Sequence, residues 1–232
     1  MCTLPILLLF PSLQSLSTII SMICHQAKYK NEEVVAEMMK RFHAFMDDAK
    51  YDDDALASSV RGTVFAYCIK NGGEKEFAAL KQYYNTTENP LDKSHSLRSL
   101  GMVRYSDKAM TDFLEWVISS DEVRSQDKVF PYRALAASGA KGREAAWKFL
   151  QERWDQWFKL FEGGFLIQHL AKIPSGFVTA EKAKEVEEFY AKIDAPACKR
   201  SMKQCIESIS QNASWRSREL ENIRKWAQSQ NK

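Results

Sequence analysis

The chain has 232 residues, which is enough for one large domain or two small ones around a buried core. Its hydrophobic fraction of 45% and charged fraction of 27% are those of an ordinary soluble globular protein. The net charge is only +3, and basic and acidic residues are interleaved without a basic block. A nucleic-acid-binding protein would show such a block, so we expect no nucleic-acid partner.

Glycine and proline are scarce, with nine Gly and six Pro in the whole chain. All-β sandwiches and barrels need many turns and use more of both residues to make them. The composition therefore favours a helical protein.

The first segment differs from the rest of the chain, because residues 2–24 carry no charged side chain. A signal peptide would have a basic start, but the first Lys or Arg is Lys28. A membrane helix needs about 20 continuous apolar residues, and Pro5, Pro11 and Gln14 interrupt this run. We therefore expect no membrane partner.

Three interpretations of this segment stay open: a weak signal sequence or anchor, a buried first helix pair, or a stretch outside the folded domain that follows a misassigned chain start. The abrupt change of composition at residues 25–30 favours the last. We accordingly expect an apolar segment at residues 1–27 and one helical domain at residues 28–232.

The cysteine content indicates a reducing compartment. The five cysteines form no CxxC pair, and their number is odd; they are Cys2, Cys24, Cys68, Cys198 and Cys205. We interpret them as buried free thiols and predict a cytoplasmic location. The alternative is a secreted or membrane-anchored protein, if residues 1–24 act as a signal or anchor.

From Asn31 onward, apolar residues recur with the period of an α-helix. Asn31 is the predicted N-cap of the first helix, with Glu32 and Glu33 in its first turn. The acidic residues 52–54 are expected to cap the next helix. Its apolar stripe is Leu56, Val60, Val64, Tyr67 and Cys68, and Asn71, Gly72 and Gly73 end it.

The middle of the chain predicts four more helices. One covers residues 74–84, and the next begins at Asn89 and Pro90, with Pro90 in the first helical position. Asp107 is expected to cap a fifth helix, and a sixth covers residues 127–138 and closes at Gly139.

The last third predicts four helices. Gly142 is expected to open a long aromatic-rich helix that ends at Gly163 and Gly164. A short helix covers residues 165–172, and Thr179 caps the helix after it. Pro196 opens the longest one. About ten helices joined by short turns predict an all-α fold, an α-solenoid of degenerate HEAT- or armadillo-like helix pairs.

Familiar catalytic patterns are missing from the printed sequence. It contains neither HExxH nor GxSxG, and no two of His25, His43, His95 and His169 lie within one helical turn. We interpret each histidine as a structural or surface residue. The aromatic run at residues 147–161 has helical spacing, which favours core packing over a ligand-binding box.

One stretch carries a family resemblance. Residues 142–172, GREAAWKFLQERWDQWFKLFEGGFLIQHLAK, are similar to the C-terminal helical domain of M1-family zinc aminopeptidases, in particular its puromycin-sensitive branch. The shared pattern is A-W-x-F-x-x-x-x-W followed by a Gly-Gly-Phe turn. Shorter pieces agree, namely S-L-G at residues 99–101, V-R-S-Q-D at 123–127 and N-A-S-W at 212–215. The resemblance covers the chain from about Lys28 onward.

The resemblance implies a helical domain that closes over a catalytic domain and forms one wall of the substrate chamber. In the family the zinc motif HExxH and the G-x-M-E-N loop lie upstream, and neither occurs in this chain. We therefore predict no cofactor and no catalytic residue in this chain, and zinc in the full-length enzyme. Its partners would be peptide substrates and an M1 catalytic domain in cis.

The leading hypothesis is thus a substrate-chamber domain, present as a fragment, an isoform or an incomplete gene model. The alternatives are a stand-alone helical-repeat module that binds a peptide or protein, and a regulator that docks onto a full-length aminopeptidase. For a detached chamber domain we expect a sizeable exposed apolar patch, where the catalytic partner would pack.

The resemblance also suggests peptide contacts. The turn at Glu162, Gly163, Gly164 and Phe165 would face the chamber, with Glu162 as a hydrogen-bond acceptor or a partner for a basic side chain. The alternative is a plain helix stop with a solvated Glu162. Arg98 and Arg104 are candidates for pairing with the C-terminal carboxylate of a peptide, because guanidinium groups match carboxylates in geometry.

Overall fold

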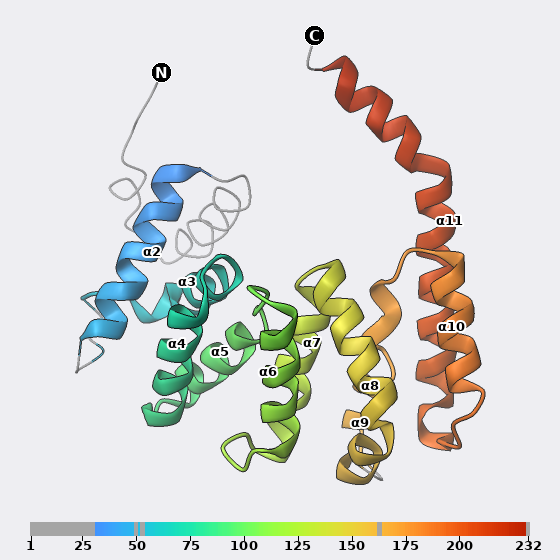
Figure 1. Cartoon of the computed structure of the whole chain (residues 1–232), viewed down its shortest axis with the longest axis horizontal. Helices are drawn as coiled ribbons and strands as arrows, with labels where there is room; N and C mark the ends of the chain where they lie inside the picture. The colour runs from blue at the N-terminus through green and yellow to red at the C-terminus, as the bar shows by residue number, and fades with distance from the viewer. Residues whose placement is uncertain (1–30, 49–50, 52–53, 162–163, 231–232) are drawn as a thin grey trace. The chain divides into compact units, whose positions relative to one another are not determined.

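The computed structural model describes residues 31–48, 51, 54–161 and 164–230 (Figure 1). Every regular element within these ranges is helical, which confirms the predicted all-α fold. The chain divides into two compact units, Met1–Leu100 and Gly101–Lys232. The solenoid arrangement stays a prediction. Residues 1–27 lie outside the described residues, as does the predicted boundary at their end.

The first unit contains four described α-helices: α2 (Glu32–Asp47), α3 (Ser58–Asn71), α4 (Glu74–Thr86) and α5 (Pro90–Leu100). Helix α3 packs against α2 and α5, and α4 also packs against α5. Aromatic rings fill the space between them. The Phe45 and Tyr83 rings meet edge to face at 5.1 Å between centroids, and Phe42 meets Phe65 at 6.0 Å. Such pairs add to the hydrophobic gain from burying the rings.

The helix ends in this unit follow the sequence signals at most positions. The side chain of Asn31 accepts a hydrogen bond from the Val34 amide, which confirms the predicted N-cap of α2. The predicted start of α3 is wrong, because the helix begins at Ser58 after Ala57 rather than behind the acidic run. Leu56 is fully buried in the turn before the helix, so its burial comes from tertiary packing and not from a helical stripe.

The second unit contains the remaining helices. They are α6 (Asp107–Ser119), α7 (Val129–Ala137), α8 (Ala140–Phe161), α9 (Leu166–Leu170), α10 (Ala180–Tyr190) and α11 (Lys199–Ser229), with short 3₁₀ turns η2 (Ser125–Asp127), η3 (Ile173–Gly176) and η4 (Pro196–Cys198). Helix α8 packs against α6 and α7, and α10 packs against α11. Because neighbours in the chain are neighbours in the unit, most packing is between successive helices.

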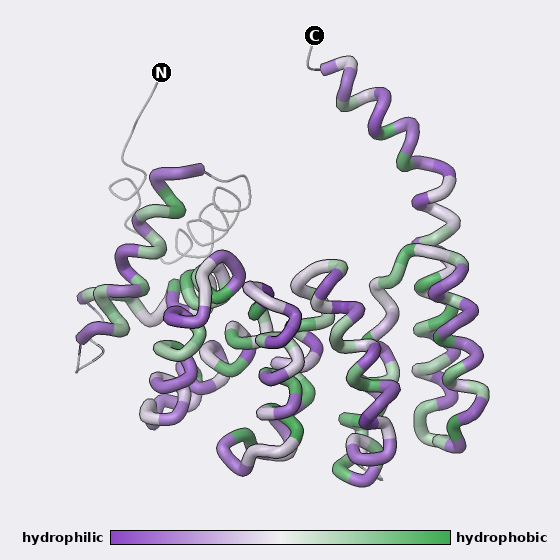
Figure 2. Tube along the Cα trace, in the orientation of Figure 1, coloured by the Kyte–Doolittle hydropathy of each residue, from purple (hydrophilic) through white to green (hydrophobic). Residues whose placement is uncertain are grey.

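Helix α8 supplies the aromatic core of this unit. Trp147 and Trp157 are fully buried, and Phe149, Trp154 and Phe161 are buried as well, which confirms the core-packing interpretation. The backbone leaves helical geometry at Arg153, with φ −119° and ψ 18°. Figure 2 shows hydrophobic and hydrophilic residues alternating along the helix, as an amphipathic packing element requires.

Three predicted helix starts in this unit need correction. Pro196 opens the 3₁₀ turn η4, and α11 begins only at Lys199. Helix α6 is capped by Ser106, whose hydroxyl accepts from the Ala109 amide, while Asp107 is the first helical residue. Helix α8 begins at Ala140, two residues before Gly142. Gly139 makes the turn with φ +154°, a conformation open to glycine. Thr179 accepts from the Lys182 amide, which confirms the predicted cap of α10.

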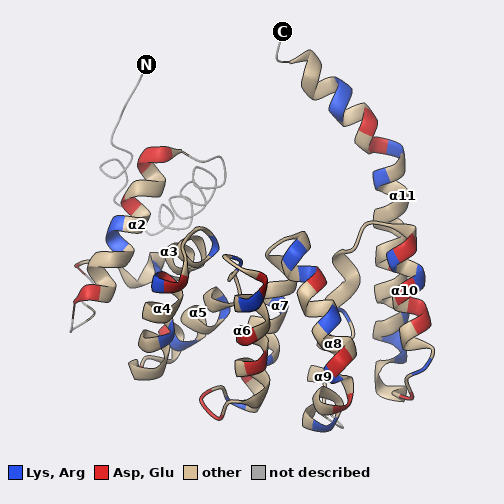
Figure 3. Cartoon of the chain, in the orientation of Figure 1, with Lys and Arg blue, Asp and Glu red and all other residues tan. Residues whose placement is uncertain are grey.

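Charged residues of both signs are spread along the helices (Figure 3). Within the described part of the chain, no helix is both long and apolar enough to cross a bilayer. The three described cysteines, Cys68, Cys198 and Cys205, are buried free thiols, as predicted. Cys2 and Cys24 lie outside the described residues.

Candidate peptide-contact site

The turn between α8 and α9 holds the main group of predicted contact residues. Helix α8 ends at Phe161, whose carbonyl accepts a hydrogen bond from the Gly164 amide at 2.9 Å. Phe165 is the N-cap of α9, and its carbonyl accepts from the Gln168 amide at 3.2 Å. Glu162 and Gly163 lie outside the described residues. The described half of the turn is therefore Gly164 and Phe165.

Phe165 presents its side chain to solvent. It is 82% exposed, whereas Ile167 and Leu170 on the same short helix are buried. Exposing a whole phenylalanine ring forgoes about 1.5–3 kcal/mol of burial free energy. The helix beneath it is fixed by these two apolar residues, and the Tyr190 hydroxyl donates to the Ala171 carbonyl at 2.9 Å just after it. An apolar ring on a fixed base suits contact with a ligand.

Two cationic side chains, Arg133 and Lys172, lie near His169 of the same short helix. Burial lowers the pKa of His169 below its ordinary value, and the nearby positive charges of Arg133 and Lys172 lower it further. The surroundings of α9 thus favour an anionic group such as a carboxylate over another cation. A neutral His169 remains able to donate or accept one hydrogen bond.

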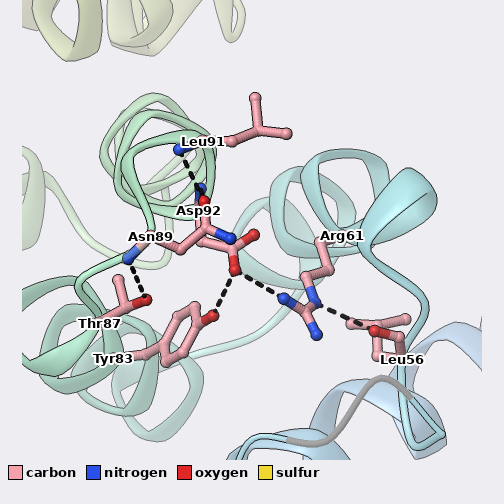
Figure 4. A network of polar contacts seen from close by, with 7 residues as sticks. All are labelled: Leu56, Arg61, Tyr83, Thr87, Asn89, Leu91 and Asp92. Atoms are coloured by element: carbon pink, nitrogen blue, oxygen red, sulfur yellow. Dashed lines mark hydrogen bonds and ion pairs between the residues drawn. The ribbon is translucent and has the colours of Figure 1, made fainter.

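Arg98 lies on α5, and a buried network fixes that helix (Figure 4). The Asp92 carboxylate accepts from Arg61 Nη1 at 2.6 Å and from the Tyr83 hydroxyl at 2.8 Å. Asn89 caps the helix by accepting from the Leu91 amide at 2.9 Å. Helix α5 is thereby tied to both α3 and α4, and Arg98 stands exposed near its end.

Arg104 belongs to the other unit, where it is exposed just before the N-cap Ser106 of α6. Arg98 and Arg104 thus lie in different compact units. A joint site for a peptide carboxylate stays a prediction.

Two polar contacts between helices, one buried and one half-buried, were not predicted from the sequence. Arg61 and Asp92 are separated by 31 residues, and no local motif marks them as partners. In the second unit, the indole of Trp147 donates to Glu185 at 2.6 Å, which ties α8 to α10. The one available signal for Arg61 was its place within the apolar stripe of α3, where a charged residue needs a partner.

The described histidines differ in their contacts and burial. His43 lies 2.9 Å from Glu76, and the ring of His95 is half-buried beside Gly62. His25 lies outside the described residues. Among the residues that the structure describes, no three His, Cys, Asp or Glu side chains gather as ligands for a metal ion.

Comparison with known proteins identifies the family. The family model of the ERAP1-like C-terminal domain matches residues 12–211. The chain belongs to the ERAP1-like C-terminal domain family. The start of this match falls inside the apolar segment at residues 1–27, and its end falls within α11.

Curated relatives of this ERAP1-like domain are aminopeptidases. It is 32% identical to Aminopeptidase M1 of Arabidopsis thaliana over 86% of the chain and 22% of that protein. It is 31% identical to Aminopeptidase M1-B of Oryza sativa subsp. japonica over 85% and 22%. It is 29% identical to Aminopeptidase 2 of Candida albicans over 89% and 22%. The chain spans about a fifth of the length of the curated relatives that it matches.

Proposed function

We propose that this ERAP1-like domain forms one wall of the peptide chamber of an M1 zinc aminopeptidase, in which a catalytic domain hydrolyses N-terminal residues of peptides. Family membership carries the proposal, because the relatives are aminopeptidases and the match covers most of the chain. The exposed Phe165 ring is the observation that selects the face, since it lies in the turn that the family resemblance directs toward peptide.

The contributions of the chain itself would be binding and orientation. Phe165 would pack against an apolar part of the peptide, and the positive charges near α9 would attract a carboxylate. Arg98 and Arg104 would bind the C-terminal carboxylate of longer peptides. Contacts away from the reacting bond hold a peptide in register, so they contribute to its productive binding.

The zinc ion of the family supplies a Lewis acid that activates water when it is bound. The described residues do not fit this ion, because no group of potential ligands gathers among them. We propose that the metal site belongs to the catalytic domain, and that this chain alone has no aminopeptidase activity. Assaying the purified chain on an aminoacyl-anilide with added Zn²⁺ tests this statement. Chelator-sensitive turnover would overturn it.

The chamber proposal is tested in a polypeptide that contains this domain together with its catalytic domain. Phe165→Ala should lower kcat/KM for a nonapeptide by about fivefold, which corresponds to about 1 kcal/mol. The matched control is Leu91→Ala, which removes another exposed apolar side chain, at the start of α5. An unchanged kcat/KM in the Phe165 variant would contradict the assigned face.

The alternative, a stand-alone peptide- or protein-binding module, predicts a different result. Under that hypothesis the isolated chain would bind peptides by itself, and Phe165→Ala would weaken that binding without any catalytic domain. Translating the genomic DNA upstream of the codon for Lys28 separates the two further. An in-frame HExxH there would favour the chamber domain. A transcript that starts at Met1 without that motif would favour the module.

A further inference from the structure

The two halves of α11 have different surroundings. In the first half, Met202, Cys205 and Ile209 are buried, and the helix packs against α10 and η3. The last polar tie is Asn212, whose amide donates to the carbonyls of Ser175 and Phe177 at 3.1 and 3.2 Å. After this point the helix continues to Ser229, beyond the start of α10, as the part of α11 nearest the C-terminus in Figure 1. We call residues 213–229 the projecting segment.

The apolar stripe does not stop where the packing stops. Steps of three and four residues from Ile209 lead to Ala213, Arg216, Leu220, Ile223 and Ala227, so the stripe continues with one charged member. Ile223 is 44% exposed, and Trp226 beside the stripe is 65% exposed. A helix presents such a stripe when another element covers it. The stripe therefore continues the α10–α11 interface without a partner among the described residues.

A groove runs along one side of this stripe. It has a volume of about 760 Å³, and its walls come from the beginning of α10 and from α11. Its lining includes Val178, Thr179 and Ala180 on one side and Ala213, Leu220 and Arg224 on the other. Val178 is exposed at this edge. Ser210, Ser214, Ser217 and Glu221 add polar groups to this lining. A groove with both apolar and polar lining residues beside a helical stripe is the kind of surface that accepts an amphipathic helix.

The charge of the projecting segment favours a partner that carries acidic side chains. It contains four basic residues, Arg216, Arg218, Arg224 and Lys225, against two acidic ones, Glu219 and Glu221, which gives a net charge of +2. The two glutamates lie 4.0 and 3.9 Å from Arg218 and Arg224. Arg216, within the stripe, has no ion-pair partner in the described part of the chain. A partner that covers the stripe would have to place a carboxylate there, because a buried lone charge is costly.

We propose that the groove and the projecting segment bind an amphipathic helix of a partner polypeptide, with an apolar stripe and acidic flanks. Residues 213–229 are about 25 Å long at 1.5 Å per residue, so the partner would need about four to five turns. A second copy of this chain fits less well, since two segments of charge +2 would repel each other. The family match ends at residue 211, so the projecting segment lies outside it, whereas the groove wall at residues 178–180 lies within it. Binding of a partner helix would be a function separate from the proposed peptide chamber.

The probe for the test is a labelled synthetic peptide of about 18 residues, with Leu at helical i, i+3, i+4 and i+7 positions and Glu at the flanks. Its control has Lys in place of every Glu. Fluorescence anisotropy with the full chain should show binding of the acidic peptide, and binding of the basic one should be at least about tenfold weaker. Hydrogen exchange should slow in residues 213–229 when the acidic peptide is present.

Variants locate the binding to this surface. Arg216→Glu should lower the affinity for the acidic peptide by about tenfold, and Leu220→Gln should lower that affinity by a similar factor. Lys203→Glu makes the same charge change on the packed half of α11, where Lys203 is exposed, and should leave binding unaltered. Thermal denaturation verifies that all three variants fold.

Several outcomes would overturn the proposal. Equal binding of the two peptides, no binding of either, or an unaffected Arg216→Glu variant would each exclude an acidic helical partner. Light scattering of the chain alone adds a further outcome. A dimer that Leu220→Gln dissociates would show that a second copy occupies the groove. None of these results depends on aminopeptidase activity, so the chamber proposal is tested independently of this one.

Discussion

At the scale of single residues, the Asp92 carboxylate determines how the first unit is held together. It is 2% exposed and accepts hydrogen bonds from Arg61 on α3 and Tyr83 on α4. Arg61 also donates to the Leu56 carbonyl at 3.0 Å and lies 4.5 Å from the centre of the Phe45 ring. The positive charge is thus satisfied on several sides, and one carboxylate connects three helices.

We expect Asp92→Asn to destabilise the chain strongly. The variant leaves the buried Arg61 charge without its counterion, and breaking a buried pair in this way costs about 3–5 kcal/mol. Urea unfolding followed by circular dichroism measures the change. Asp112→Asn is the control, because Asp112 pairs with Lys108 on the exposed surface of α6, where screening by water makes a pair contribute little. Similar unfolding midpoints for the two variants would contradict the assigned role of Asp92.

Gly142 is the second residue for which we expect a large effect. A Cβ atom at this position would lie 2.3 Å from Ser138 Oγ and 2.4 Å from the Leu135 carbonyl oxygen, and the latter is backbone. Gly142→Ala should therefore destabilise the chain by about 1–3 kcal/mol, although alanine favours helices. At Gly73 the nearest atom would be 3.9 Å away, so Gly73→Ala is the control. A Gly142→Ala variant that is as stable as the Gly73→Ala variant would show that Ser138 and Leu135 can move to accommodate the added Cβ atom at little cost in free energy.

At the scale of elements, Asn212 is the tie between η3 and α11. Asn212→Ala removes two hydrogen bonds and leaves the Ser175 and Phe177 carbonyls without that donor. We expect a loss of about 1–3 kcal/mol and faster amide exchange in residues 173–178. Asn222→Ala serves for comparison, because Asn222 donates only to the Arg218 carbonyl within the projecting segment. Unchanged exchange in η3 would mean that apolar packing alone fixes this turn.

The same element shows why a helix can be half core and half surface. Helix α11 keeps one apolar stripe along its length, but α10 and η3 cover only its first half. Stripe residues are buried where α10 and η3 cover them, half-buried at Ala213 and Leu220 beside the start of α10, and exposed at Ile223. The projecting segment is consequently where we place a partner helix.

At the scale of the whole molecule, stability should fall in alkaline solution. Burial raises the pKa of the Cys68 thiol from 9.0 to about 12, and burial raises that of Cys205 to about 12 as well. Above pH 9 the unfolded thiols lose protons that the folded ones keep until about pH 12. The unfolding free energy should fall by about 1.4 kcal/mol per pH unit for each such thiol. It should be unaffected by these groups below that window.

Urea unfolding at about pH 8 and pH 10 measures how the unfolding free energy changes with pH. These two values lie on either side of the ordinary thiol pKa. Cys68→Ala should reduce the slope by the contribution of one thiol, whatever its effect on stability at pH 8. A slope that is the same in the variant and the parent would contradict the burial of this thiol as the cause. Burial also raises the pKa of Tyr83 to about 12, so a further decline is expected above pH 10.

The sequence predicted much of the fold and less of the site. Asn31 and Thr179 were identifiable as caps, because capping is a contact between neighbours in the chain. The aromatic residues of α8 were identifiable as core by their spacing. The beginning of α3 was not, because the burial of Leu56 depends on packing outside its own helix. The Arg61–Asp92 pair was not identifiable either, since its partners are 31 residues apart.

The sequence by itself determined the all-α class, most helix ends and the resemblance to M1 aminopeptidases, because periodicity, caps and motifs are local properties of the chain. The tertiary structure decided which members of a pattern are covered. Phe161 and Phe165 lie four residues apart in the sequence, yet the first is buried and the second is exposed. Ile223 continues the stripe of Ile209, yet it is 44% exposed while Ile209 is fully buried. Whether an apolar face becomes core or binding surface depends on which other elements of the chain pack against it. The spacing of residues within one helix does not contain that information.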